Sequence, residues 1–189
     1  MTKFLTSTVM TLTLMIAAPT LADTYNFDAS HTAVTWHINH FGFSNPSGKF
    51  MSAKGALALD EKTPDNSKVE LDIDVTAINT GVAKLDEHLK TKDFFDVAQF
   101  PTAHFVSTKV EQTGADTATV TGDLTLHGVT KPITLAVHLN KIGQNMMGKK
   151  TAGFTASGKL KRSDFGMTTY IPNLGDEVTI DIEAEANAG

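Results

Sequence analysis

Histidine is the residue type through which this sequence would most readily do metal or acid–base chemistry, and seven are present. His37 and His40 stand three positions apart in a segment where apolar and polar residues alternate. On a β-strand, that spacing puts the two side chains on opposite faces, so they cannot share one metal ion. The chain also lacks cysteine and any His-Glu-x-x-His pattern, which are common sources of zinc ligands. We therefore expect structural or solvated histidines and no metal site.

A second candidate group for acid–base chemistry is formed by Glu70, Asp72 and Asp74. Apolar residues fill the positions between these carboxylates, as on the solvent-facing side of a half-buried strand. The sequence contains no Gly-x-Ser-x-Gly nucleophile motif and no phosphate-binding glycine loop. Because no pattern supports catalysis, we expect a protein that is not an enzyme. An enzyme acting on an apolar substrate remains an alternative.

Arg162 is the only arginine in the chain. Its planar guanidinium can bind a carboxylate or a phosphate through two parallel hydrogen bonds, which lysine cannot do. One interpretation is that Arg162 contacts the polar head of a ligand. The other, which we favour, is a structural ion pair with Asp164, Asp93 or Asp96 that holds a loop in place.

These side chains must be positioned mainly by β-strands, because alternation of apolar and polar residues dominates the sequence. The clearest case is the stretch 177–186, in which Val178, Ile180 and Ile182 share one face and acidic residues share the other. Eight such stretches are predicted: 34–38, 55–59, 69–75, 103–110, 118–126, 131–140, 152–160 and 177–186. Only residues 82–89 show helical spacing, with Asn79 or Thr80 as a candidate N-cap. The pattern predicts an all-β fold: an extended, antiparallel, eight-stranded barrel with a short helix inserted mid-chain.

An apolar barrel lumen would collect the inward-facing side chains of these strands. Phenylalanines in the loops would cap one end of the barrel or line its mouth, and ordinary packing at the barrel end is the alternative. The candidate ligand contacts are Trp36, Ile38, Phe41, Leu71, Ile73, Phe94, Phe95, Phe105, Leu135, Val137, Arg162, Phe165 and Ile180. For Trp36, contact with a ligand and simple filling of the lumen both remain open.

Residues 1–22 are predicted to be a cleaved signal peptide, followed by one domain over residues 23–189. Lys3 precedes an apolar run, and small residues precede Asp23. That run is too short and too rich in threonine for a membrane span. The formal net charge of −5 disfavours binding to nucleic acid or to an anionic membrane.

Several motifs, distributed over nearly the whole mature chain, resemble those of the YceI-like family of periplasmic or secreted bacterial lipid-binding proteins. The motifs are Asp28-x-x-His31, Val34-x-Trp36-x-Ile38-x-His40-Phe41-Gly42, Gly48-Lys49-Phe50, Ala77-Ile78-Asn79-Thr80, His88-Leu89-x4-Phe94-Phe95-Asp96, Phe100-Pro101, Phe105, Gly122 to Lys131, and Arg162-x-x-Phe165-Gly166. The resemblance implies a lipocalin-like barrel with a helix after about the fourth strand.

The same resemblance implies a periplasmic protein whose pocket holds a long apolar chain, such as a polyisoprenoid, an isoprenoid quinone or a fatty amide. Its partner would then be a long-chain isoprenoid or fatty lipid, with no nucleic acid, no integral membrane span and no cofactor other than such a bound lipid or quinone. Assembly as a homodimer is left open. The rival to a carrier, besides an enzyme, is an interaction module whose barrel is filled by its own side chains.

Overall fold

The computed structural model describes residues 22–189, and most of them lie in one continuous antiparallel sheet. The predicted signal peptide lies outside the described residues except for Ala22. The strands are β1 (Asp23–Phe27), β2 (Ala33–His40), β3 (Ser47–Phe50), β4 (Ala53–Leu59), β5 (Lys68–Asp74), β6 (Ile78–Asn79), β7 (Thr102–Gln112), β8 (Thr117–Leu126), β9 (Val129–Gln144), β10 (Lys150–Lys161) and β11 (Leu174–Ala188). The helices are α1 (Ala83–Leu89) and three single 3₁₀ turns, Pro64–Asn66, Val75–Ala77 and Arg162–Phe165.

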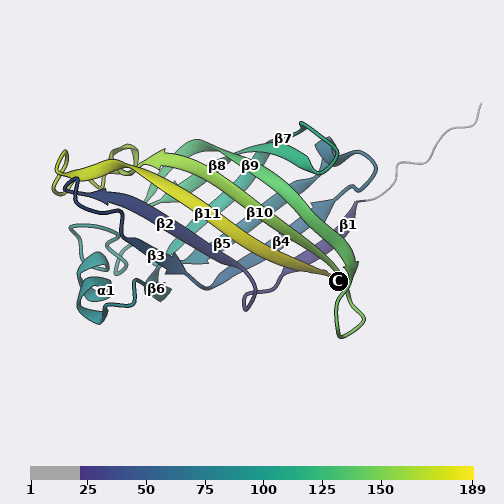
Figure 1. Cartoon of the computed structure of the whole chain (residues 1–189), viewed down its shortest axis with the longest axis horizontal. Helices are drawn as coiled ribbons and strands as arrows, with labels where there is room; N and C mark the ends of the chain where they lie inside the picture. Colours follow the sequence, from purple (N-terminus) through teal and green to yellow (C-terminus); the bar gives the residue numbers. More distant parts are fainter. Residues whose placement is uncertain (1–21) are drawn as a thin grey trace, which may run out of the picture.

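The sheet closes into a barrel because β1 pairs with β11 as well as with β4 (Figure 1). Strands β1 and β2 both pair with β11. On their other side, β1 pairs with β4 and β2 pairs with β3. Further along the sheet, β4 pairs with β5 and β3 pairs with β6. Three pairs of strands that are consecutive in the chain, β1 with β2, β3 with β4 and β5 with β6, therefore each form one long strand with an interruption. The barrel thus has eight long antiparallel strands, which confirms the fold predicted from the alternation.

The first interruption is built by Asp28, at the turn between β1 and β2. Its carboxylate accepts hydrogen bonds from the backbone N–H of Ser30 at 2.9 Å, from Ser30 Oγ at 2.7 Å and from Nδ1 of His31 at 3.0 Å. The bond from the Ser30 hydroxyl is the main reason that the pKa of Asp28 lies far below its usual range. The Asp28-x-x-His31 motif therefore shapes a turn. The sequence interpretation began the first strand at residue 34 and so missed β1.

Helix α1 lies where helical spacing predicted it, but its start is not capped as expected. Neither Asn79 nor Thr80 is the N-cap, a position that Val82 occupies without a side-chain hydrogen bond. Instead, Asp86 reaches back from within the helix and accepts bonds from the backbone N–H and the hydroxyl of Thr80, at 2.7 and 2.6 Å. These bonds fasten the helix to the end of β6.

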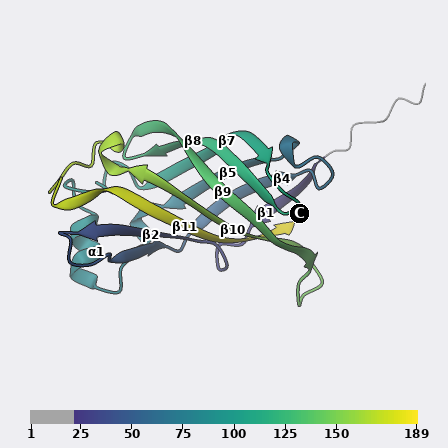
Figure 2. The ribbon, with the colours of Figure 1, turned by 45° about the horizontal axis from the view of Figure 1, so that its top comes forward.

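The position of α1 in the chain is close to the one that the resemblance implied, after about the fourth strand. It follows the third long strand, β5 with β6, and precedes the fourth, β7. In the sheet order of the described residues, β6 is a terminal strand that pairs with β3, and the next strand in the chain, β7, pairs with β5 and β8. Helix α1 contacts β6 and lies at the end of the barrel opposite the C-terminus (Figure 2). We call that end of the barrel the α1 end, and the opposite end, with the C-terminus, the C-terminal end.

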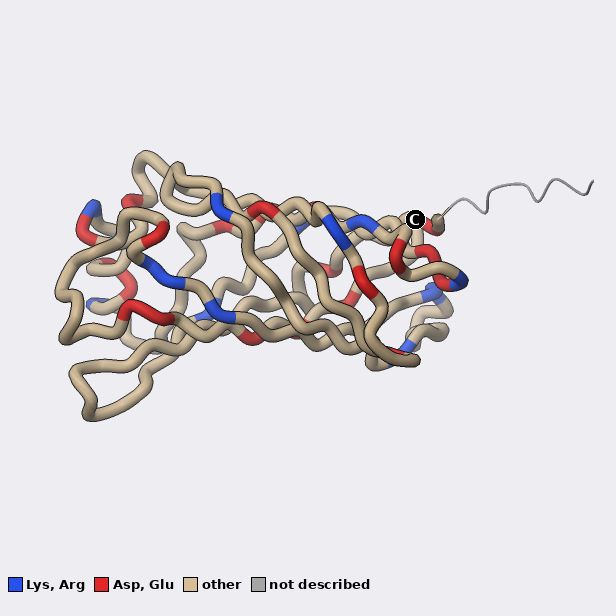
Figure 3. Tube along the Cα trace, turned by 90° about the horizontal axis from the view of Figure 1, so that it is seen from above, with Lys and Arg blue, Asp and Glu red and all other residues tan. Residues whose placement is uncertain are grey.

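Acidic and basic residues are interspersed along the strands and loops of the barrel (Figure 3). Glu70 and Asp72 lie on this outer face, where Nδ1 of His104 bonds to Oδ1 of Asp72 at 2.7 Å. The carboxylate group noted in the sequence is therefore the wet face of a strand, as predicted. The inner faces form one large apolar cluster and a smaller one around Tyr25 at the C-terminal end.

Candidate functional site: the barrel cavity

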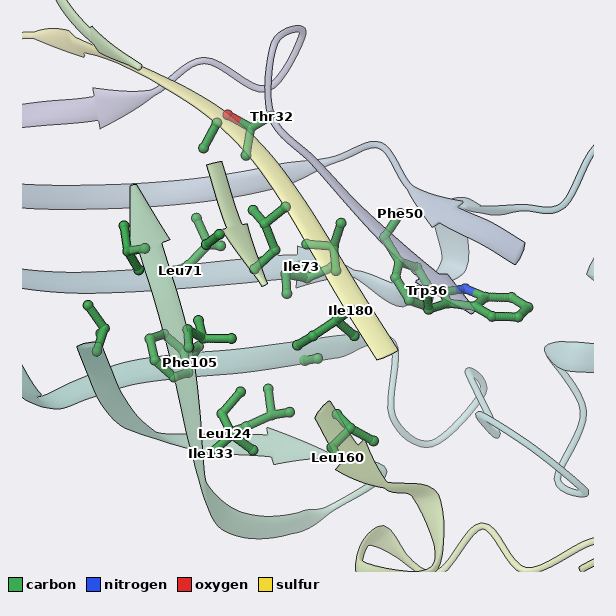
Figure 4. A pocket seen from close by; sticks show the side chains of 18 of the residues that line it. Thr32, Trp36, Phe50, Leu71, Ile73, Phe105, Leu124, Ile133, Leu160 and Ile180 are labelled. Atoms are coloured by element: carbon green, nitrogen blue, oxygen red, sulfur yellow. The ribbon is translucent and has the colours of Figure 1, made fainter. Parts of the chain in front are cut away.

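The barrel encloses a cavity of about 940 Å³. Its wall consists mainly of apolar side chains that point inward from the strands, as the close-up of Leu71, Phe105 and Ile180 shows (Figure 4). Pockets for drug-sized ligands have volumes of about 300–1,000 Å³. The side chains of this barrel therefore leave a ligand-sized space, which argues against an interaction module with a filled lumen.

Twelve of the thirteen candidate ligand contacts lie in the cavity wall. They are Trp36, Ile38, Phe41, Leu71, Ile73, Phe94, Phe95, Phe105, Leu135, Val137, Arg162 and Ile180. Phe165 does not belong to this wall. It is 1% exposed and packs in the core, and its carbonyl oxygen lies 2.9 Å from Nδ1 of His127. The expected contact between Phe165 and a ligand in the lumen is therefore corrected to a structural role.

The sequence interpretation omitted several wall residues. Leu124, Ile133 and Leu160 line the cavity from β8, β9 and β10 (Figure 4). All three fall inside predicted strands and on the apolar side of the alternation, so the pattern contained the signal needed to find them. Phe50 and Leu174 also line the cavity. Both lie outside the predicted strands, so the alternation did not mark them as wall residues.

The ionisable residues of the wall gather at the two ends of the cavity. His40, His88 and Arg162 lie at the α1 end, whereas Glu61, Lys62, Lys68 and Asp116 lie at the C-terminal end. The wall between them is apolar. Such a lumen suits a long hydrocarbon chain whose polar group stays near one end.

Aromatic rings from the loops form part of the α1 end of the wall. Phe94 is buried and stands edge-on to the ring of His88, with 5.1 Å between the ring centroids. Phe95 stands edge-on to Phe50 at 5.5 Å. Phe41 has a left-handed backbone with a φ of 55°, and its N–H donates to the carbonyl of Asn173 at 3.0 Å. These contacts tie the β2–β3 loop and the segment after α1 to the rim of the cavity.

The remaining loop phenylalanines lie elsewhere. Phe43 is 91% exposed at the tip of the β2–β3 loop and is not part of the wall. The ring of Phe100 packs edge-on against His127 at 4.9 Å. The loop phenylalanines therefore supply three wall residues, Phe41, Phe94 and Phe95, rather than one continuous cap.

Arg162 is 4% exposed and binds three backbone carbonyls. Its Nε donates to Gly175 at 2.8 Å, Nη1 donates to Met167 at 2.9 Å and Nη2 donates to Leu174 at 3.0 Å. Burial lowers the pKa of the guanidinium, and the charge of nearby Asp176 acts in the opposite direction. The structural interpretation of Arg162 is supported, but the expected partners Asp164, Asp93 and Asp96 are wrong. Carbonyls from the loop before β11 and from its start take their place.

His37 and His138 each lie close to a carboxylate on the outside of the barrel. Nε2 of His37 lies 3.4 Å from Asp181, and Nε2 of His138 lies 3.2 Å from Asp116. Across residues 22–189, no three histidine, cysteine, aspartate or glutamate side chains gather as metal ligands would.

No helix within residues 22–189 has the length and apolar character needed to cross a membrane.

Comparison with known proteins agrees with this architecture. The model of the YceI-like domain matches residues 25–186. A protein of Pseudomonas fluorescens, described as a UPF0312 protein, is 37% identical over 185 residues, which cover 97% of this chain and 96% of that protein. Among solved structures, the YCEI protein of Campylobacter jejuni is 31% identical, with a TM-score of 0.73 over 80% of this chain and 90% of that one.

A more distant structure shares the fold. A polyisoprenoid binding domain from Saccharophagus degradans is 16% identical, with a TM-score of 0.68 over 89% of this chain and 99% of that chain. The domain match spans almost all of the described barrel, and the Pseudomonas relative is similar over nearly its full length. The chain therefore belongs to the YceI-like family.

Proposed function

We propose that this protein binds one long apolar lipid inside its barrel, with a polyisoprenoid or an isoprenoid quinone as the favoured class. The observation that carries the proposal is the apolar cavity of about 940 Å³ with its ionisable residues at the ends. The polyisoprenoid binding domain from Saccharophagus degradans has the same fold, and we extend its ligand class to this chain. The protein would act as a periplasmic carrier or as a sequestering protein.

Apolar burial alone provides enough free energy for such binding. Each methylene removed from water contributes about 0.8 kcal/mol, so ten of them contribute about 8 kcal/mol before the cost of ordering the chain. Binding therefore needs no special chemistry in the middle of the lumen. The polar groups at the cavity ends would orient the head of the lipid.

Protein purified from the periplasm of a bacterium that makes it is expected to retain a lipid. Mass spectrometry of the organic extract should find a long-chain isoprenoid or fatty lipid in a ratio near one per barrel. The control is the Leu135→Glu variant, purified in the same way, which should carry much less. An extract whose lipid composition matches that of whole cells, with no lipid enriched, would contradict the proposal.

A quinone that enters the lumen is expected to quench the emission of Trp36, because Trp36 lies in the wall and is the only tryptophan. Titration of lipid-free protein with a prenylated quinone should quench this emission saturably, near one ligand per barrel. A saturated isoprenoid of the same length should shift the emission without strong quenching. Quenching that does not saturate would indicate collisions at the surface.

The mature protein is expected to begin near Asp23 after export. Cleavage after Ala22 would leave β1 whole, because that strand starts at Asp23 and closes the barrel with β11. N-terminal sequencing of the periplasmic fraction tests this expectation. Recovery of the protein with residues 1–22 still attached, in the membrane fraction, would refute it.

A further inference from the structure

At the α1 end, the mouth of the cavity is bordered by aromatic side chains that belong both to the wall and to the outer surface. Phe41 and Tyr170 line the cavity, yet they are 45% and 56% exposed. The ring of Tyr170 lies 6.4 Å, between centroids, from the ring of Phe94, which is buried in the same wall. The apolar lining of the lumen therefore continues onto the outer surface at this end.

A third ring, that of Phe43, is held in solvent at the tip of the β2–β3 loop, where it is 91% exposed. The loop itself is well bonded: the N–H of His40 donates to the carbonyl of Ser44 at 2.8 Å, and the N–H of Phe43 donates to the carbonyl of His40 at 3.0 Å. The N–H of Gly42 also donates to Oδ1 of Asn39, at 2.9 Å. Because these bonds fix the loop without any contact from the Phe43 ring, that ring is free to contact a partner.

The β2–β3 loop and the loop before β11 form one rim. The N–H of Phe41 donates to the carbonyl of Asn173 at 3.0 Å and so joins the two loops. Both lie at the end of the barrel that is far from the C-terminus (Figures 1 and 2). Phe41 and Tyr170 both have left-handed backbones, with φ values of 55° and 64°. Residues other than glycine rarely adopt this conformation, and such strain gathers at functional sites.

The two loops of this rim are free of aspartate, glutamate, lysine and arginine. The stretches 38–48 and 165–175 contain none of these residues, which make up 20% of the whole chain, and His40 is their ionisable side chain. At the C-terminal end, by contrast, the border of the cavity includes Glu61 and Lys62. Loops without charges can enter the surface of a bilayer without the cost of moving a charge out of water. Aromatic rings are also the side chains that favour the boundary between membrane and water.

We propose that the rim formed by Phe41, Phe43 and Tyr170 docks on the surface of a lipid bilayer, with its rings among the headgroups and the mouth of the lumen facing the bilayer. An apolar lipid would then pass between bilayer and lumen without crossing water. The inference rests on the proposed function and deepens it, because it names the surface that supplies or receives the ligand. A protein partner or a second copy of this chain on the rim would cover the mouth, whereas a bilayer holds the ligand directly at it.

The opposite end of the barrel provides a matched control. The turn between β9 and β10 carries Met146 and Met147, which are 105% and 81% exposed. Neither methionine lines the cavity, and Lys149 and Lys150 follow them directly. This turn is therefore an exposed apolar tip of similar size that has no connection to the lumen.

The first test measures docking on vesicles. The mature protein is mixed with phosphatidylcholine vesicles, and the fraction that sediments with them gives a partition coefficient. Phe43→Ser should lower this coefficient by about tenfold, because a ring among the headgroups loses part of its contact with water. The double variant Met146→Ser, Met147→Ser should leave it unchanged. Native protein that does not sediment with the vesicles, or equal losses in the two variants, would overturn the inference.

The second test observes the rim itself. Phe43→Trp places a reporter at the loop tip, and the native protein, whose only tryptophan is Trp36, gives the baseline. Phosphatidylcholine vesicles should shift the emission of the new indole to shorter wavelength, and lipids with brominated chains should quench it. Met147→Trp, at the other end, should show neither change. The reverse result, with a response only from Met147→Trp, would place docking at the C-terminal end and overturn the inference.

A third measurement separates the two proposals. Phe43 is not part of the cavity wall, so a prenylated quinone added without vesicles should quench Trp36 equally in the native protein and in Phe43→Ser. Failure of the quinone to quench the native protein would contradict the proposed function and, with it, the transfer of lipid through the rim. Saturable quenching in both proteins, together with equal sedimentation on vesicles, would contradict the inference alone. A native dimer that Phe43→Ser converts to monomer in analytical ultracentrifugation would assign the rim to a second copy and also overturn it.

Discussion

Leu135→Glu is expected to lower the free energy of unfolding by about 3–5 kcal/mol and to abolish lipid binding. Leu135 is 7% exposed, and its side chain lies in the cavity wall on β9. A Cβ on the neighbouring Gly158 would come within 2.8 Å of Leu135 Cδ2, so the side chain has little freedom to move aside. A carboxylate at this position would face an apolar lumen with no cation beside it. Urea denaturation and lipid binding measure the two effects, and Val137→Glu should behave in the same way.

Acid should partly restore the stability of the Leu135→Glu variant. Burial raises the pKa of the introduced carboxyl group above its unfolded value of about 4.3. The loss of stability caused by the buried charge is therefore absent below that unfolded pKa, where the group is protonated in both the folded and the unfolded state. This loss grows as the pH rises toward the folded pKa. The difference in the free energy of unfolding between the variant and the native protein should shrink as the pH falls toward about 4. A difference that does not depend on pH would point to a steric cause.

Thr134→Glu is the matched control, because Thr134 lies next to Leu135 on the exposed face of β9. The change should alter stability by less than about 0.5 kcal/mol, as is usual for surface substitutions. Equal losses in the two variants would contradict the assignment of the faces of β9.

Arg162→Lys is expected to lower the free energy of unfolding by about 2–4 kcal/mol. The lysine keeps the charge, but its single ammonium cannot span the carbonyls of Met167, Leu174 and Gly175. At least one carbonyl would lose its donor in a buried site. Thermal or urea denaturation provides the measurement.

The same variant decides whether Arg162 also contacts the lipid. Because three of its donors already bind carbonyls, the preference for charged over neutral lipid heads should stay constant while stability falls. A selective loss of charged-head lipids would instead assign Arg162 to the ligand. Lys161→Arg makes the reverse exchange at the neighbouring exposed position and should change neither quantity.

The closed barrel and most of its inner wall could be predicted from the sequence, because the two faces of a strand alternate with a period of two residues. That local rule is enough to place Trp36, Leu71 and Ile180 on the inner side without knowledge of the neighbouring strands. The helical spacing of Val82, Leu85 and Leu89 likewise located α1. Strand β1 was missed because it has only five residues before the turn at Asp28.

The tertiary structure alone decided the roles of residues outside the regular strands, because those roles depend on contacts between segments distant in sequence. Phe165 and Phe94 are both loop phenylalanines, yet the fold buries one in the core and places the other in the cavity wall. Arg162 was marked by its chemistry, but its partners are backbone carbonyls, which no side-chain pattern reveals. The unpaired N–H of Trp36 is likewise a property that only the tertiary structure reveals. Alternation shows that the indole faces inward, and only the packed barrel shows that no acceptor of the protein reaches it.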